Sequence, residues 1–183
     1  MIEQPPSISR SARSALIERF FGAYRHHAAL DPDLYPPLRS GRLTQGNYRT
    51  LEQSLGFRLP WSFKEWHRLF HSDQPIEVAS VSLPLSPARN AIAHLAGELL
   101  DMNDGEELLP HRLLPFGYSE ATGEVLAFDA RVSREDDEYP IVAFDHEYAV
   151  PQILSRIEPA HSHFCDLLVG LTNYLESDMA HGA

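Results

Sequence analysis

Apolar positions change their spacing along this chain, and the change separates helical from extended segments. Residues 76–83 and three stretches between Arg112 and Phe144 are short and β-rich, whereas the segments before and after them follow a helical period. From Ser11 to Leu30 the pattern predicts a helix whose buried face carries Leu16, Phe20, Ala23, Tyr24 and His27. The Asp31-Pro32 pair ends this helix, and three prolines between Asp31 and Arg42 predict an irregular connector.

Two further helices are predicted in the first half of the chain. One runs from Thr44 as N-cap to Leu55, with Gly56 directly after it. The other is short and ends at Phe70, and a Ser-x-x-Glu capping box at its start begins with Ser62. The faces predicted to be buried carry Tyr48, Leu51 and Leu55 in the first helix and Phe63, Trp66 and Phe70 in the second. Core packing is favoured for Trp61 and Trp66 over an aromatic ligand platform.

The second half begins with one expected strand, from Ile76 to Leu83, followed by a helix from Ser86 to Met102. Three β-rich runs then follow, joined by turn signals, and they predict an antiparallel meander: Arg112 to Gly117, Val125 to Phe128 and Ile141 to Phe144. A last strand is expected from Gln152 to Ile157, and then a helix capped by Ser162. This order predicts an α+β fold, a mostly antiparallel sheet flanked by helices.

Charge is unevenly placed in a chain whose formal net charge is −11. Up to Pro75 there are ten Lys and Arg against seven Asp and Glu, a net of +3, and from Ile76 there are five against nineteen, a net of −14. Two runs concentrate the acidity, Asp101 to Glu107 and Glu135 to Glu138, and the second is expected to be a solvated loop. Such a field repels nucleic acid and anionic membranes and attracts basic proteins, although solubility alone is the simpler explanation.

The sequence carries no convincing catalytic, cofactor or metal motif. Cys165 is the single cysteine, and neither a phosphate-binding loop nor a Gly-x-Ser-x-Gly turn occurs. Asp145, His146 and Glu147 resemble metal ligands, but neighbouring residues of a strand point to opposite faces. His161, His163 and Cys165 also resemble ligands, but at a helix start only His161 and Cys165 share a face, and a role at the helix end is favoured. We therefore expect no catalytic residue, cofactor or metal, and a hydrolase using Asp145, His146 and Glu147 remains the enzymatic alternative.

Targeting signals are also absent from the sequence. No run of about 18 or more apolar residues occurs, and the N-terminal segment MIEQPPSISRSARS lacks the apolar core of a signal peptide. We therefore expect a cytoplasmic protein with no membrane partner.

The segment LEQSLGFRLPWSFKEWHRLF, from Leu51 to Phe70, resembles the opening of SUKH superfamily (Smi/Knr-type) domains. The strands that contain Leu113-Leu114-Pro115-Phe116-Gly117, Val125 to Asp129 and Pro140 to Glu147 follow in the family's order, as does a C-terminal helix carrying Phe164 and Leu168. The chain departs from the family where Phe70 to Pro75 replaces an Asn-Gly-Gly type of turn. The resemblance implies a SUKH-like domain over 44–176, preceded by a helical and Pro-rich extension over 1–43 and followed by a tail over 177–183.

The resemblance also implies a function that is not enzymatic. Bacterial SUKH proteins are largely immunity proteins that bind and neutralise toxins, often nucleases, while fungal relatives act in cell-wall signalling. We therefore expect an immunity protein for a cognate, basic toxin, with no nucleic-acid partner. The alternative is a regulatory scaffold that binds a cellular protein. The residues expected at the rim of the contact surface are Asp104, Glu106, Glu107, Glu135, Asp136, Asp137 and Glu138.

Overall fold

The computed structural model describes residues 9–41, 43–84, 91–102, 104–132 and 137–181. Within these residues the main sheet has six strands, each hydrogen-bonded antiparallel to the next in chain order. The three β-rich runs predicted from the sequence are its centre, β5, β6 and β7, so the predicted meander and the α+β class are confirmed. The strands are β3 (Ile76–Val78), β4 (Val81–Leu83), β5 (Leu113–Ser119), β6 (Glu124–Asp129), β7 (Ile141–Asp145) and β8 (Glu158–His161).

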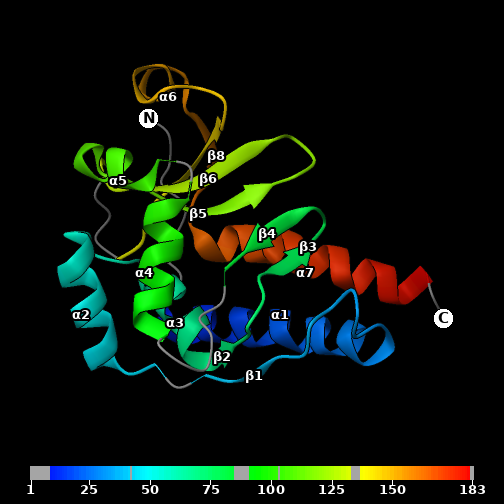
Figure 1. The fold of residues 1–183 in the computed structure, drawn as a ribbon. Helices are drawn as coiled ribbons and strands as arrows, with labels where there is room; N and C mark the ends of the chain where they lie inside the picture. The colour runs from blue at the N-terminus through cyan, green and yellow to red at the C-terminus, as the bar shows by residue number, and fades with distance from the viewer. Residues whose placement is uncertain (1–8, 42, 85–90, 103, 133–136, 182–183) are drawn as a thin grey trace.

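Helices surround this sheet on both sides (Figure 1). A separate two-stranded pair, β1 (Arg39–Ser40) with β2 (Phe70–His71), ties the connector after the first helix to the end of the third. The connector therefore contains a short strand that the prolines did not predict. The helices are α1 (Arg10–Leu30), α2 (Gln45–Leu55), α3 (Trp61–Leu69), α4 (Ala91–Asp101), α5 (Gly105–Leu108), α6 (Val150–Arg156) and α7 (Phe164–His181), with a 3-10 turn η1 at Leu109–His111.

Helices α1 and α2 form where the apolar period and the caps predict them. The predicted face of α1 is buried at Phe20, Ala23, Tyr24 and His27, and half-buried at Leu16. The Thr44 hydroxyl accepts the backbone N–H of Asn47, whose side chain accepts the N–H of Thr44, so the N-terminus of α2 is capped reciprocally. Gly56 ends α2 in the left-handed conformation, at φ +60°.

The start of α3 differs from the prediction. Pro60 holds the N-cap position, and Ser62 lies inside the first turn instead of capping it. The predicted capping box is wrong because both of its side chains have partners elsewhere: the Ser62 hydroxyl donates to Glu138, and the Glu65 carboxylate accepts hydrogen bonds from Ser14 and Arg68. The α3 N-terminus is therefore capped by a residue from a distant part of the chain.

Two further differences concern strands. The single strand expected from Ile76 to Leu83 is a tight hairpin, β3 and β4, which reverses at Ala79 and Ser80 with φ angles of 52° and 61°. The strand expected from Gln152 to Ile157 is helix α6, which has Pro151 in its first turn, and the last strand, β8, begins only at Glu158. The predicted helix from Ser86 is described from Ala91 onward, and residues 86–90 lie outside the described part.

Both faces of the central strands are apolar, and each face packs against a different set of helices. In β6, Leu126 and Phe128 join the main core with α1, α2, α3, α4 and α7, whereas Val125 and Ala127 point to the other side. There they form a smaller cluster with α5 and α6. This double burial explains why β5, β6 and β7 are continuous apolar runs, unlike the alternating strands of a sheet with one solvated face.

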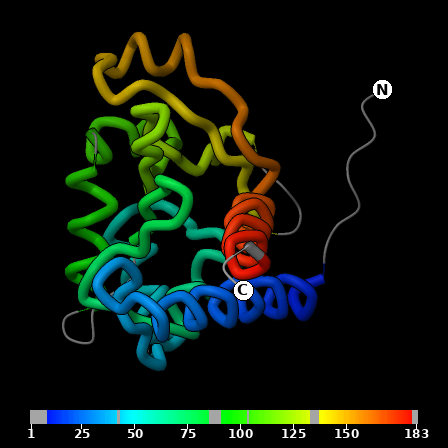
Figure 2. The backbone as a smooth tube through the Cα atoms, turned by 90° about the vertical axis from the view of Figure 1, so that its right-hand side faces the viewer, coloured from blue at the N-terminus to red at the C-terminus, as the bar shows by residue number. Residues whose placement is uncertain are grey.

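Aromatic rings fill the centre of the main core. Trp66 of α3 is fully buried, as predicted, and its ring centre lies 5.2 Å from that of Phe20, 4.5 Å from that of Phe21 and 5.6 Å from that of Phe164. Figure 2 shows α7 almost end-on, with α1 passing across it. Helix α1 is therefore an integral wall of this core. None of the described helices is long and apolar enough to cross a membrane.

Candidate protein-binding surface

Five carboxylates are exposed on α4, on α5 and at the N-cap of α5: Glu98, Asp101, Asp104, Glu106 and Glu107. We call them the α4–α5 acidic surface. The sequence has no Lys or Arg between Ala91 and His111, so no permanently charged basic side chain of this segment neutralises them. Within the described residues, the recorded ion pair of this surface joins Glu98 to His94, at 3.6 Å. The expected rim residues Asp104, Glu106 and Glu107 are thus brought together and are solvent-accessible.

Packing beneath this surface fixes the position of its carboxylates. Leu95 and Leu99 anchor α4 in the main core, and Leu108 anchors α5 in the smaller cluster. Gly105, the first residue of α5, lies so close to α4 that an added Cβ would lie 2.3 Å from the Leu99 carbonyl oxygen. The backbone that carries the acidic groups is therefore held in place, so less conformational entropy is lost when a partner binds.

The second acidic run is not the solvated loop that its composition predicted. Glu135 and Asp136 lie outside the described residues, and Glu138 is buried, with 1% of its side chain exposed. Its carboxylate accepts the Ser62 backbone N–H at 2.9 Å and the Ser62 hydroxyl at 2.7 Å, and it lies 3.2 Å from the equally buried guanidinium of Arg13. A buried carboxylate is tolerated here because it is hydrogen-bonded and paired, so Glu138 cannot form part of a contact rim.

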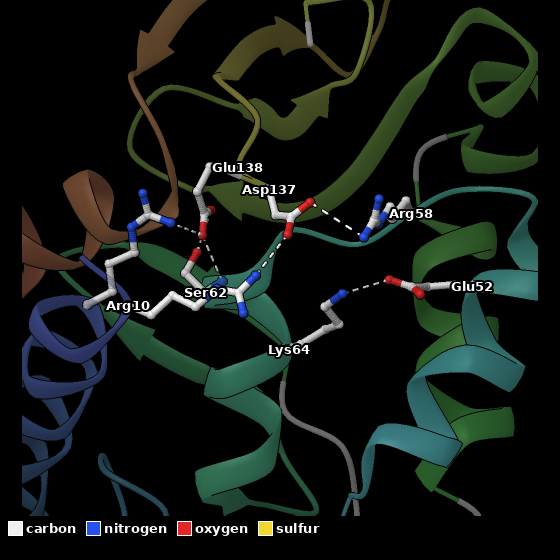
Figure 3. A network of polar contacts seen from close by, with 8 residues as sticks. Arg10, Glu52, Arg58, Ser62, Lys64, Asp137 and Glu138 are labelled. Atoms are coloured by element: carbon white, nitrogen blue, oxygen red, sulfur yellow. Dashed lines mark hydrogen bonds and ion pairs between the residues drawn. The ribbon is translucent and has the colours of Figure 1, made fainter. Parts of the chain in front are cut away.

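Asp137, its neighbour, is only partly accessible and is engaged on both sides. Its backbone carbonyl accepts the Trp61 N–H at 2.9 Å, while its carboxylate lies 2.9 Å from Arg10 and 3.6 Å from Arg58. Figure 3 shows Asp137 between these two arginines, with Glu138 directed at Ser62. Together, Asp137 and Glu138 fasten this part of the chain to the start of α3. Asp137 is therefore available to a partner only in competition with two arginines.

A hollow of about 300 Å³ lies next to this anchor, between the ends of α1, α2 and α3. We call it the cationic hollow, because five of its lining residues are basic and three are acidic. Trp61, expected in the core, is half-buried and faces this hollow, whereas Trp66 is fully buried. The residues that line it are Arg10, Gln45, Tyr48, Arg49, Glu52, Arg58, Trp61, Lys64, Glu65, Arg68 and Asp137.

The ligand-like residues of the C-terminal half are occupied by local contacts. His146 Nδ1 lies 2.8 Å from the Gly123 carbonyl oxygen, and Asp145 accepts the backbone N–H of Glu147 at 2.9 Å. Cys165 is buried, and burial raises the pKa of its thiol to about 12, which suppresses the thiolate that metals and electrophiles require. Within the described part of the chain, no group of three His, Cys, Asp or Glu side chains is arranged to hold a metal ion.

Comparison with known families decides the affiliation of this fold. Residues 43–159 match the model of the SMI1 / KNR4 family (SUKH-1), which is more than half of the chain. The chain belongs to the SUKH-1 family. The matched SUKH-1 region contains α2, α3 and most of the sheet, while α1 and α7 lie outside it. The comparison with curated proteins found no match.

Sequence reasoning missed two elements of these surfaces. Glu98 and Asp101 belong to the α4–α5 acidic surface but were not among the expected rim residues, although Asp101 begins the first acidic run and lies three residues after Glu98 on the polar side of α4. The cationic hollow had no such signal, because its basic residues come from α1, α2, α3 and the loop between α2 and α3.

Proposed function

We propose that this SUKH-1 protein is an immunity protein that binds a cognate toxin directly and thereby neutralises it. Family membership supports this proposal, because the SUKH resemblance implies immunity proteins that act by binding. The observation that carries it is the α4–α5 acidic surface, five exposed carboxylates in a stretch of sequence, 91–111, that contains no Lys or Arg. A basic toxin would be steered to such a surface, and its association would slow as salt screens the attraction.

Partly buried apolar side chains of α4 offer further contacts from which a partner could exclude water. Ile92, Ala96 and Leu100 are half-buried and lie four residues apart, so they form one stripe along α4. Contact areas of this kind, apolar in the middle and charged at the edge, are typical of specific protein complexes. We therefore place the centre of the toxin-binding surface on α4 and its acidic rim on the α4–α5 acidic surface.

The second acidic run contributes differently from what its composition suggested. Glu135 and Asp136 remain proposed rim residues. Asp137 is proposed as a residue at the edge of the contact, where its two arginines limit its attraction for a partner. Glu138 is not proposed again, because it is buried, and its contribution is to fix the loop to α3.

The proposal implies a protein without catalytic activity that acts in the cytoplasm, where the toxin would reach its target. The alternative is a regulatory scaffold for a cellular protein, which would use the same surface without any toxin. The two proposals differ in the partner that they require: immunity requires a toxin encoded beside this chain, and the scaffold requires a cellular protein. Immunity requires that the chain protects cells from one toxin and leaves them sensitive to unrelated toxins, because specificity needs matched contacts beyond opposite charge.

The test combines protection with binding kinetics. This chain is co-expressed in cells with the toxin encoded next to it. The survival of these cells is compared with that of cells that co-express the chain with unrelated toxins. Association is then measured for a variant in which Glu98, Glu106 and Glu107 are replaced by Gln and Asp101 and Asp104 by Asn. We expect association at low salt to slow by on the order of tenfold or more and to lose most of its salt dependence.

A matched control removes the same charge elsewhere. It carries the corresponding amide substitutions at five carboxylates that are exposed on other elements: Asp33, Asp73, Glu77, Glu147 and Glu158. If both variants slow association equally, net charge and not this surface is responsible. Survival that does not depend on the chain would reject immunity, and a stable complex with a cellular protein would favour the scaffold.

A further inference from the structure

The cationic hollow carries an excess of positive charge in a chain whose net charge is −11. Its lining contains four arginines and one lysine against three carboxylates, an excess of two positive charges. Its volume of about 300 Å³ lies within the range of small-molecule sites. It lies outside the α4–α5 acidic surface and shares only Asp137 with the proposed toxin contact, so the toxin-binding proposal leaves its basic residues unexplained.

The three carboxylates of the hollow are already engaged with basic partners. Glu65 accepts two hydrogen bonds from Arg68, both at 2.6 Å, and these bonds lower the pKa of its carboxyl group. Glu52 accepts one from Lys64 and one from the Leu59 backbone N–H, each at 2.9 Å. The carboxylate of Asp137 accepts one from Arg10 at 2.9 Å. These pairs account for three of the five positive charges.

Arg49 and Arg58 supply the remaining two. The Arg58 guanidinium lies 3.6 Å from Asp137, beyond hydrogen-bonding distance, and 71% of its side chain is exposed. Arg49, also exposed, forms no ion pair with a described carboxylate. Both arginines also line a second, shallower hollow of about 310 Å³, and Glu52 is among its other lining residues. Two guanidinium groups with free donors therefore border adjoining hollows.

We propose that the cationic hollow binds a small phosphate-bearing ligand about the size of a nucleoside diphosphate, with Arg49 and Arg58 as its phosphate donors. The planar, forked guanidinium group matches the oxygens of a phosphate and can donate two parallel hydrogen bonds to it. The half-buried ring of Trp61 lies on the wall of the same hollow, with the Arg10 guanidinium 5.7 Å from its centre. An aromatic ring beside a phosphate site offers a surface on which a base can stack.

Titration with defined probes tests this assignment on the whole chain. Pyrophosphate and ADP are added at low ionic strength, and binding is followed by calorimetry. We expect saturable binding of both, with dissociation constants below about 1 mM. Tighter binding of ADP would show that the nucleoside contributes, whereas equal affinities would restrict the site to the phosphates, and either result supports the proposal. Replacing Arg49 and Arg58 together with Gln is expected to weaken binding by roughly a hundredfold.

Two controls make the outcome decisive. Arg39→Gln removes an exposed arginine from outside the cationic hollow and is expected to leave binding unchanged. Citrate, an anion of comparable charge without phosphate, should bind at least roughly tenfold more weakly than pyrophosphate. The proposal is overturned if neither phosphate probe binds, if citrate binds equally well, or if the Arg49/Arg58 variant binds as the Arg39 variant does. None of these results bears on toxin binding.

Discussion

The Glu138 carboxylate accepts both the backbone N–H and the hydroxyl of Ser62, at 2.9 and 2.7 Å, and so closes the N-terminus of α3 from a point 76 residues away in sequence. The positive end of the helix dipole and the buried guanidinium of Arg13 both favour a negative charge at this position. This one carboxylate therefore joins three segments that are distant in the chain: α1, α3 and the residues before β7.

Removing this carboxylate should be costly. Glu138→Ala takes the counter-charge of Glu138 away from the buried Arg13 and is expected to destabilise the fold by about 3–5 kcal/mol, measured by urea denaturation. The double variant Glu138→Ala with Arg13→Met should regain part of that loss, because no buried charge is left uncompensated. Asp137→Ala, at the more accessible neighbouring pair, should cost no more than about 1 kcal/mol. Equal losses at 137 and 138 would contradict this assignment.

Trp66 should be among the most important side chains of the core. Trp66→Ala removes the ring that packs between Phe20, Phe21 and Phe164 and is expected to cost about 3–5 kcal/mol of unfolding free energy. It also takes away the indole N–H that donates to the Pro84 carbonyl oxygen at 3.2 Å. Trp61→Ala, at a half-buried position, provides the comparison and should cost less. A loss below about 1 kcal/mol for Trp66→Ala would reject its core role.

His67 should make the stability of this protein sensitive to mild acid. Burial lowers the pKa of its imidazole from 6.5 to about 3 in the folded state. Between these two pH values the unfolded chain therefore binds a proton that the folded chain does not. The contribution of neutral His67 to the unfolding free energy is fully present above pH 6.5 and is lost as the pH falls from there toward 3. The loss approaches about 1.4 kcal/mol per pH unit within this window.

The corresponding experiment compares unfolding free energies between pH 7 and pH 5 for the natural chain and for His67→Leu. The variant should show a clearly shallower decline, whatever its stability at pH 7. His67→Gln serves the same purpose if the leucine variant does not fold. Parallel curves for the variant and the natural chain would show that His67 does not titrate as its burial implies.

Gly105 should tolerate no side chain. A Cβ at this position would lie 2.3 Å from the Leu99 carbonyl oxygen and 2.7 Å from that of Leu100, so Gly105→Ala must displace α5 from α4 at a cost of about 1–3 kcal/mol. Gly22→Ala is the matched control, because no atom lies within 4 Å of its added Cβ. In the exposed interior of α1 that substitution should stabilise the protein by about 0.5–1 kcal/mol. Thermal melts of the two variants should therefore shift in opposite directions.

The correctly predicted elements are those whose signals are local. Helix α2 has its N-cap at Thr44 and its left-handed terminator at Gly56, and the strands β5, β6 and β7 are apolar runs separated by turn residues. The hairpin at Ala79 and Ser80 escaped prediction because both residues adopt positive φ without a glycine to indicate the turn. Helix α6 escaped because a short apolar segment fits a strand and a short helix equally well.

Burial of the acidic run could not be predicted from its own composition. Glu138 is stabilised by Arg13, which lies 125 residues earlier in the chain, and by the start of α3, so its neighbours in sequence give no indication of its environment. The cationic hollow was missed for the same reason, since its basic residues belong to several elements. Asp104, Glu106 and Glu107 were predicted to be exposed and are, because their environment is set by α5, which carries two of them and has Asp104 as its N-cap.

The place of α1 and α7 in the core limits how this protein can be divided. The region that matches the family, 43–159, contains neither helix, although Phe20, Phe21 and Phe164 enclose Trp66 from outside it. A chain shortened to that region would expose a large aromatic surface to water, and such surfaces promote aggregation. The unit that could be fused to another protein, or exchanged between relatives, therefore has to include both flanking helices.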